Sequence, residues 1–163
     1  MKVNQIYKTY NIPPNLQRHM LRVAGLAEIL SENWTGETIN KTAMVFACLF
    51  HDACKLLNFD LSRPELFEEE AENIDYWRWV QTEIAHKRGT NEHKATLQVC
   101  KEIMLPTKAI QLIDNLEWCY INGILEYRNM ESAITVYSDM RIGPFGIITL
   151  EERFNELRSR VAF

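Results

Sequence analysis

Glycine and proline are scarce in this chain of 163 residues, which has only 6 glycines and 5 prolines. Sandwiches, barrels and disordered chains usually contain more of both, so this scarcity favours helices. Long apolar runs are also missing: the longest, AMVFACLF, has 8 residues, whereas a membrane-spanning helix needs about 20. The N-terminal MKVNQIYKTYN lacks the apolar core of a signal peptide. These absences predict a cytoplasmic protein without a membrane partner.

Positive charge is not in excess, because 18 Lys and Arg against 22 Asp and Glu give a net charge of -4. Such a chain has no general attraction for a nucleic acid polymer, so local cations or a metal must hold any phosphorylated ligand. We expect a small partner and either a monomer or a homodimer. The cysteines form no Cys-x-x-Cys pair and are predicted to be reduced and structural: Cys48, Cys54, Cys100 and Cys119.

Helical periodicity recurs in successive segments of the sequence. After IPP, apolar residues recur at steps of three and four, and the middle of a second helix, about 38–55, is apolar on all sides, which is typical of a buried helix. The acidic run EEEAE is predicted to be a solvated surface. Further helical patterns cover 74–86, 90–104, 107–126, 129–143 and 149–161. No segment alternates with period two, so we expect one all-α, bundle-like domain over residues 1–163, with six or seven helices.

The buried helix ends on two ionisable residues, His51 and Asp52. A carboxylate in apolar surroundings costs several kcal/mol or shifts its pKa, so this pair needs compensation, which a bound cation provides. His19 beside the first apolar face and Asp139 in VYSDMR are candidates to complete such a site. Imidazole and carboxylate ligands without a thiolate suit Mn, Fe, Co, Ni, Mg or catalytic Zn, and do not suit a closed structural zinc site.

Three segments, HMLRVAGLAEIL, ACLFHDACK and VYSDMR, resemble the signature of the HD-domain superfamily. The resemblance extends over residues 15 to 158 and implies a divalent metal held by His19, His51, Asp52 and Asp139. It also implies a metal-dependent phosphohydrolase that acts on a nucleotide or another small phosphoester. In this chemistry the metal lowers the pKa of its bound water, so that a metal-bound hydroxide attacks phosphorus, and Asp52 orients that water.

Lys55 matches the lysine in the HDxGK form of this signature, so we expect it to contact phosphate as a point charge. Cys54 stands where that form has glycine, and a solvated helix end is an equal alternative for Lys55.

Four more residues flank the break at Gly89. The resemblance implies that His86 and His93 are either contacts to a second metal or substrate, or structural residues; Lys87 and Lys94 either form a phosphate-binding rim or are surface charges. A second metal would allow another function, a di-iron oxygenase of the HD type. A third possibility is a non-catalytic sensor that binds a nucleotide or a metal.

Overall fold

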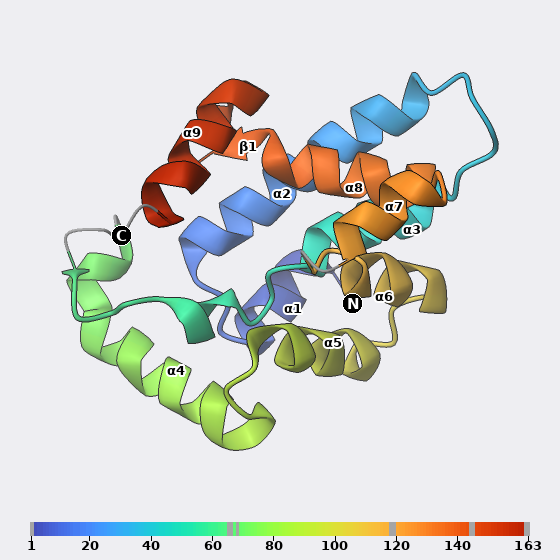
Figure 1. Cartoon of the computed structure of the whole chain (residues 1–163). Coiled ribbons are helices and arrows are strands. Elements are labelled where there is room, and N and C mark those ends of the chain that lie inside the picture. The colour runs from blue at the N-terminus through green and yellow to red at the C-terminus, as the bar shows by residue number, and fades with distance from the viewer. Residues whose placement is uncertain (1, 65–66, 68, 118–119, 144–145, 162–163) are drawn as a thin grey trace.

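The computed structural model describes residues 2–64, 67, 69–117, 120–143 and 146–161. It confirms the all-α prediction, because the described part contains nine α-helices and one small antiparallel ribbon (Figure 1). The α-helices are α1 (Val3–Thr9), α2 (Pro14–Glu32), α3 (Lys41–Phe50), α4 (Ile74–Arg88), α5 (Glu92–Glu102), α6 (Thr107–Asp114), α7 (Ile121–Glu126), α8 (Met130–Met140) and α9 (Leu150–Val161). The 3-10 helices η1 (Lys55–Asn58) and η3 (Glu69–Asn73) and the strands β1 (Ile142–Gly143) and β2 (Gly146–Ile147) complete the described elements.

The described part has more helices than the six or seven expected, for two reasons. The segment 107–126 is not one helix, because α6 ends at its C-cap Asn115, whose side chain donates a hydrogen bond to Ser132 Oγ on α8 at 3.0 Å. At the N-terminus, α1 forms because Ile6 and Tyr7 are buried on one face. Tyr7 also donates its hydroxyl hydrogen to the carbonyl oxygen of Leu49 at 2.7 Å, which attaches α1 to α3.

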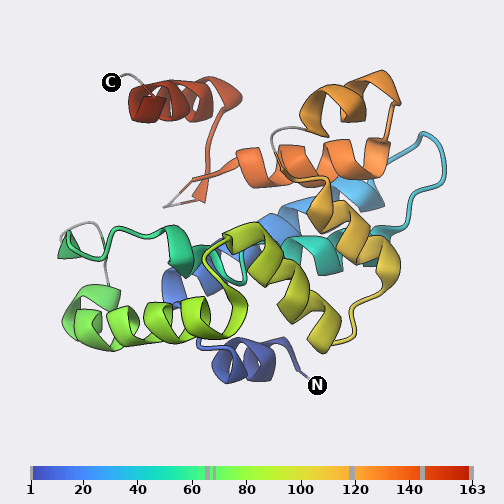
Figure 2. The same ribbon diagram turned by 60° about the horizontal axis from the view of Figure 1, so that its bottom comes forward.

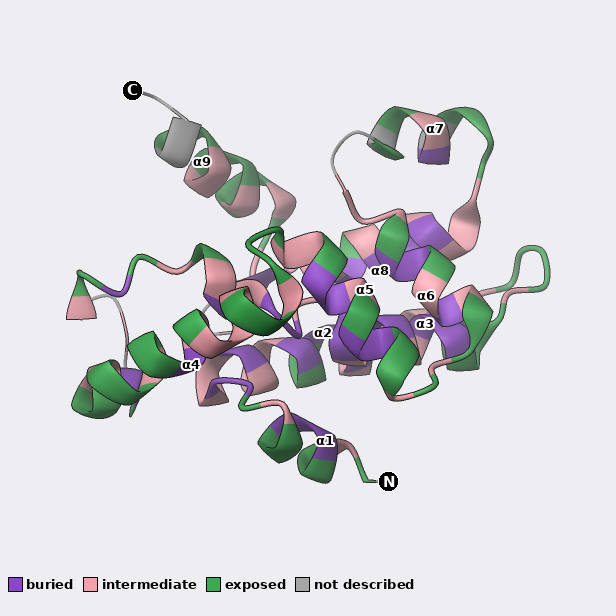
Figure 3. Cartoon of the chain, turned by 90° about the horizontal axis from the view of Figure 1, so that it is seen from below, coloured by how far each residue is buried: buried purple, intermediate pink, exposed green. Residues whose placement is uncertain are grey.

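Helix α3 lies at the centre of the core, as its uniformly apolar sequence predicted. It packs against α2, α6 and α8, and Figure 3 shows the buried residues concentrated on α3 and on parts of these three helices. Met44, Ala47, Cys48 and Phe50 are all buried on α3. The helix therefore ends inside the molecule, and the residues that follow Phe50 begin next to α2 and α8.

Side-chain caps fix where several helices begin. The side-chain oxygens of Asn40, Asn91 and Asn129 accept backbone N–H groups at the starts of α3, α5 and α8. Thr149 and Glu152 form the capping box that the sequence predicts before α9. In both views of the chain α9 lies outside the packed helices, beyond the ribbon that follows α8 (Figures 1 and 2).

Residue 68 of the acidic run EEEAE lies outside the described residues, and for Glu70 the prediction of a solvated surface is wrong. Only 2% of Glu70 is exposed, and its Oε1 accepts the backbone N–H of Asn15 at 2.8 Å. Glu69 adds an ion pair with Arg18 at 2.7 Å. The first turn of a helix has unpaired N–H groups and a partial positive charge, so these carboxylates stabilise the start of α2.

The cysteine prediction is confirmed where it can be followed, because Cys48, Cys54 and Cys100 are buried and free. Cys119 lies outside the described residues. Within the described part of the chain, no helix combines the length and the apolar character that crossing a membrane requires.

Candidate metal centre

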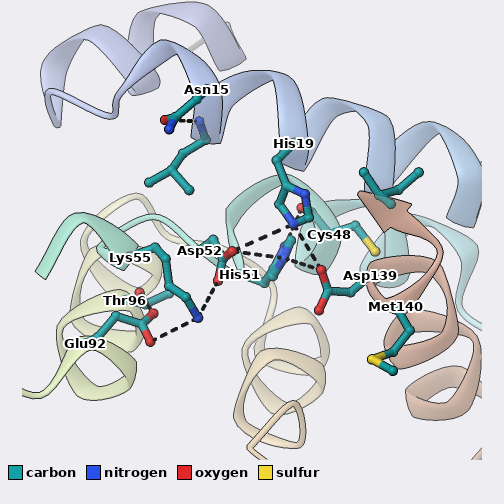
Figure 4. A network of polar contacts seen from close by, with 12 residues as sticks. Asn15, His19, Cys48, His51, Asp52, Lys55, Glu92, Thr96, Asp139 and Met140 are labelled. Atoms are coloured by element: carbon teal, nitrogen blue, oxygen red, sulfur yellow. Dashed lines mark hydrogen bonds and ion pairs between the residues drawn. The ribbon is translucent and has the colours of Figure 1, made fainter. Parts of the chain in front are cut away.

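Three helices bring the four predicted ligands together (Figure 4). His19 lies in the middle of α2, His51 is the C-cap of α3, Asp52 follows in the next turn, and Asp139 is in the last turn of α8. Their positions follow from the packing, since α3 ends against α2 and α8 in the core. Residues 120 positions apart in sequence, His19 and Asp139, are therefore in direct contact.

The distances describe a compact cluster. His19 Nε2 is 3.0 Å from Asp139 Oδ1, and His51 Nε2 is 3.4 Å from the same oxygen. One ligand atom from each of these three residues lies within 4.8 Å of the other two, a spacing that suits a single shared cation. Asp52 Oδ2 lies 3.7 Å from both Nε2 atoms. The structure therefore places the fourth predicted ligand beside the other three.

His51 is oriented by the main chain. Its Nδ1–H donates a hydrogen bond to the carbonyl oxygen of Cys48 at 2.9 Å, so Nε2 is the nitrogen that faces the cluster. Metal-binding histidines are commonly fixed in this way, through a hydrogen bond from the ring nitrogen that does not bind the metal. Within the described residues, His51 Nε2 is buried and has no hydrogen-bond partner of good geometry. A buried nitrogen beside carboxylates needs a proton or a cation, so this donor set fits a divalent metal.

The electrostatics of the cluster also favour a cation. Burial alone would lower the pKa of His51, but the carboxylates of Asp52 and Asp139 outweigh burial and raise it to about 9. Burial alone would raise the pKa of Asp139, but the hydrogen bond with His19 and the charges of His19 and His51 hold it well below its usual range. The carboxylates of the cluster therefore stabilise positive charge, even when a protonated imidazole is its only source.

A cavity of about 400 Å³ opens beside the cluster. Its described lining is His51, Asp52, Lys55, Glu92, His93, Ile113, Leu116, Glu117, Val136, Asp139 and Met140. Such a volume is within the range of small-molecule sites in proteins. Lys55 Nζ lies in it, 3.6 Å from Asp52 Oδ1 and 3.8 Å from Glu92 Oε2. Burial alone would lower the pKa of Lys55, but these carboxylates raise it, so the ammonium stays charged.

Glu92 is an ionisable residue of this cavity that the sequence analysis missed, as it also missed Glu117. Its position directly after the N-cap Asn91 is typical of an acidic residue that stabilises the start of a helix. Burial is the main reason that the pKa of Glu92 is raised, and the nearby charge of Lys55 acts in the opposite direction. The one sequence signal for Glu92 was its place next to His93, which the resemblance had singled out.

The remaining candidates separate into two groups. His93 lines the cavity, and its Nε2 is 3.0 Å from Asp114 Oδ1. His86 is exposed in the last turn of α4 and is not among the described residues that line the cavity. Lys87 and Lys94 are also exposed and do not belong to the described lining; Lys87 pairs with Glu83 on its own helix at 3.4 Å. The geometry thus leaves the predicted phosphate-binding rim without support.

The family model described as HD domain matches residues 16–119, which is more than half of the chain. The chain belongs to the HD-domain family. The matched segment contains His19, His51 and Asp52, and it ends 20 residues before Asp139, which α8 supplies. No curated protein and no solved structure matches the chain.

Proposed function

We propose that this HD-domain protein is a metal-dependent phosphohydrolase that acts on a nucleotide or another small phosphoester. The observation that supports this most is the convergence of His19, His51, Asp52 and Asp139 in one cluster, from which His51, Asp52 and Asp139 line the cavity. HD-domain proteins are generally hydrolases, and this donor set suits divalent metals. A small phosphorylated compound is the partner that such a cavity would take.

These four residues would hold the metal, which, when bound, supplies positive charge to phosphoryl oxygens and lowers the pKa of coordinated water. Asp52 has a second task, because it faces the imidazoles with Oδ2 and Lys55 with Oδ1. It can therefore accept a hydrogen bond from the attacking water and orient it. Lys55 lies in the cavity as a compact positive charge that binds a phosphate oxygen.

One metal per chain is the expected content. Mn, Fe, Co, Ni, Mg and catalytic Zn all accept imidazole and carboxylate ligands, so cellular supply contributes to the choice. The di-iron oxygenase would require His86 and His93 at a second iron, and the exposed position of His86 gives that alternative no support.

Metal content and phosphate release test the proposal together. Protein purified without chelator is analysed for metals, and phosphate release from nucleotides and simple phosphoesters is measured with each of the six metals. We expect about one metal per chain and metal-dependent release, both lost in Asp139→Asn and both kept in Asp75→Asn, because Asp75 is an exposed carboxylate on α4. Wild-type protein that binds none of the metals, or releases no phosphate with any of them, would contradict the proposal. A nucleotide that binds tightly and is recovered unchanged would indicate a sensor.

A further inference from the structure

The cavity has little positive charge for a site that is to receive phosphate. Among the described residues that line it, Lys55 is the one Lys or Arg, whereas Asp52, Glu92, Glu117 and Asp139 are carboxylates. With neutral imidazoles these groups carry a formal charge of -3, and a divalent cation reduces it to -1. Like charges repel strongly in a partly enclosed cavity, so each further negative charge on a ligand weakens its binding.

The single ammonium group is already balanced. Figure 4 shows Lys55 between Asp52 and Glu92, at the two distances given above. Asp52 also faces the imidazoles and is a proposed metal ligand. Glu92 is therefore the carboxylate that remains to balance Lys55 when the metal site is filled.

Glu92 is fixed in the wall of the cavity. Only 14% of its side chain is exposed, and its Oε1 accepts a hydrogen bond from Thr96 Oγ1 at 3.3 Å. Thr96 Oγ1 in turn accepts the backbone N–H of Cys54 at 3.1 Å, directly before Lys55 in sequence. The Glu92 carboxylate is thus linked through Thr96 to the backbone directly before Lys55. It therefore lies beside any ligand that contacts Lys55.

The other side of the cavity is formed mainly by apolar side chains, although Glu117 follows Leu116 in the turn after α6. Helices α6 and α8 and the turn after α6 contribute Ile113, Leu116, Val136 and Met140 to its lining. Figure 4 shows Met140 on the opposite side of Asp139 from Lys55 and Glu92. An uncharged organic group suits this wall, while a phosphate group suits the wall that carries the cluster and Lys55.

Sites for di- and triphosphates usually surround the phosphate chain with several cations and backbone N–H groups. We propose that Glu92 makes this cavity selective for substrates with one phosphate group and an uncharged organic part, because it balances Lys55 and repels the added charges of di- and triphosphates. The inference rests on the proposed function and names the substrate class of the same site.

Phosphate release from the mono-, di- and triphosphate of one nucleoside tests this selectivity, at a buffered concentration of free metal. We expect wild-type kcat/KM to favour the monophosphate over the triphosphate at least about tenfold. Glu92→Gln keeps the shape and the oxygen that Thr96 contacts, and should lower that ratio by at least about threefold. The matched control is Glu83→Gln, since Glu83 is a carboxylate on α4 that pairs with Lys87 outside the cavity; it should keep the wild-type ratio.

Calorimetric titration with inorganic phosphate and with tripolyphosphate gives a second readout that needs no turnover. Wild-type protein should bind phosphate more tightly than tripolyphosphate, and Glu92→Gln should reduce this difference in affinity. Glu117→Gln is a second variant with the same expectation. A triphosphate that is hydrolysed as efficiently as the monophosphate, or a Glu92→Gln protein with the wild-type ratio in both assays, overturns the inference. If no nucleotide is hydrolysed, the proposed function fails, and the titration still decides whether Glu92 sets phosphate selectivity.

Discussion

Arg153 on α9 holds the end of the helix that carries Asp139. Its guanidinium donates hydrogen bonds to three backbone carbonyl oxygens: Asp139 at 3.3 Å, Met140 at 3.2 Å and Ile142 at 2.6 Å. Only 13% of its side chain is exposed, and Glu156 lies 3.0 Å away as its counter-ion. The last carbonyl groups of a helix lack partners within the helix, so Arg153 acts as a cap that fixes where α8 ends. We predict that Arg153→Met loosens this end.

The magnitude follows from the three bonds. The bond to Asp139 is long, which leaves two effective hydrogen bonds from a charged donor, each contributing about 1.5 to 3 kcal/mol. Water can replace part of this hydrogen bonding, because the end of the helix is only partly buried. The expected loss in the free energy of unfolding is therefore about 2 to 3 kcal/mol. For a chain of this size that loss lowers Tm by about 4 to 12 °C. Because Asp139 loses its fixed position, we also expect metal affinity to fall about tenfold.

Denaturant unfolding of the metal-free protein measures the first effect, and calorimetric titration with Mn²⁺ measures the second. Arg158→Met is the matched control on the same helix, because Arg158 is exposed and its contact with Asn155 is long, at 3.4 Å. It should change stability by less than about 0.5 kcal/mol. Arg153→Lys keeps the charge without the planar fork and should recover only part of both losses. An Arg153→Met protein as stable as wild type refutes the cap, and one that is less stable but binds Mn²⁺ normally refutes the positioning of Asp139.

Three further predictions concern stability. Burial alone would raise the pKa of Glu131, but hydrogen bonds from Lys108 and from Asn40 N–H lower it. Glu131 therefore stabilises the fold above the ordinary glutamate pKa and loses this effect as pH falls through the lowered value. Glu131→Gln should cost about 1 kcal/mol at pH 7 and nothing at a pH below both values, which unfolding curves at the two conditions will show. Tyr7→Phe leaves the carbonyl oxygen of Leu49 without its partner and should cost about 1 to 3 kcal/mol in the same assay; a cost near zero would mean that α1 is not held by this bond. Chelator should lower the Tm of metal-loaded wild type reversibly and leave Asp139→Asn unaffected in a thermal scan, and an equal response of both would place the metal elsewhere.

The sequence predicted the parts of the fold that depend on local pattern. An all-apolar segment has no solvent-facing side, so the burial of α3 could be predicted without knowing its neighbours. The capping box at Thr149 and Glu152 is local for the same reason. By contrast, α6 ends where Asn115 meets Ser132 on another helix, and that contact is absent from any window of sequence around Asn115.

The same distinction between local pattern and long-range contact applies to the candidate site. His51 and Asp52 could be selected because a buried helix that ends on ionisable groups has a cost that needs compensation. Glu92 could not, since an acidic residue after an N-cap already has a local explanation, and only the packing of α5 against η1 brings it to the cavity. Glu70 was missed because an acidic run usually remains solvated, whereas this one meets the start of α2.

The cluster links folding to metal binding across the length of the chain. His19 and His51 lie within the segment that matches the family, but Asp139 reaches them only when α8 packs on α2 and α3. A cation held by all of these residues, as proposed above, would bind the packed arrangement and not the separated helices, so its binding free energy would stabilise the docking of α8. Arg153 favours the same arrangement from the other side, because its carbonyl partners lie at the end of α8 and in β1. Residues after the matched segment therefore contribute to the proposed metal site, since they decide how often Asp139 lies beside His19 and His51.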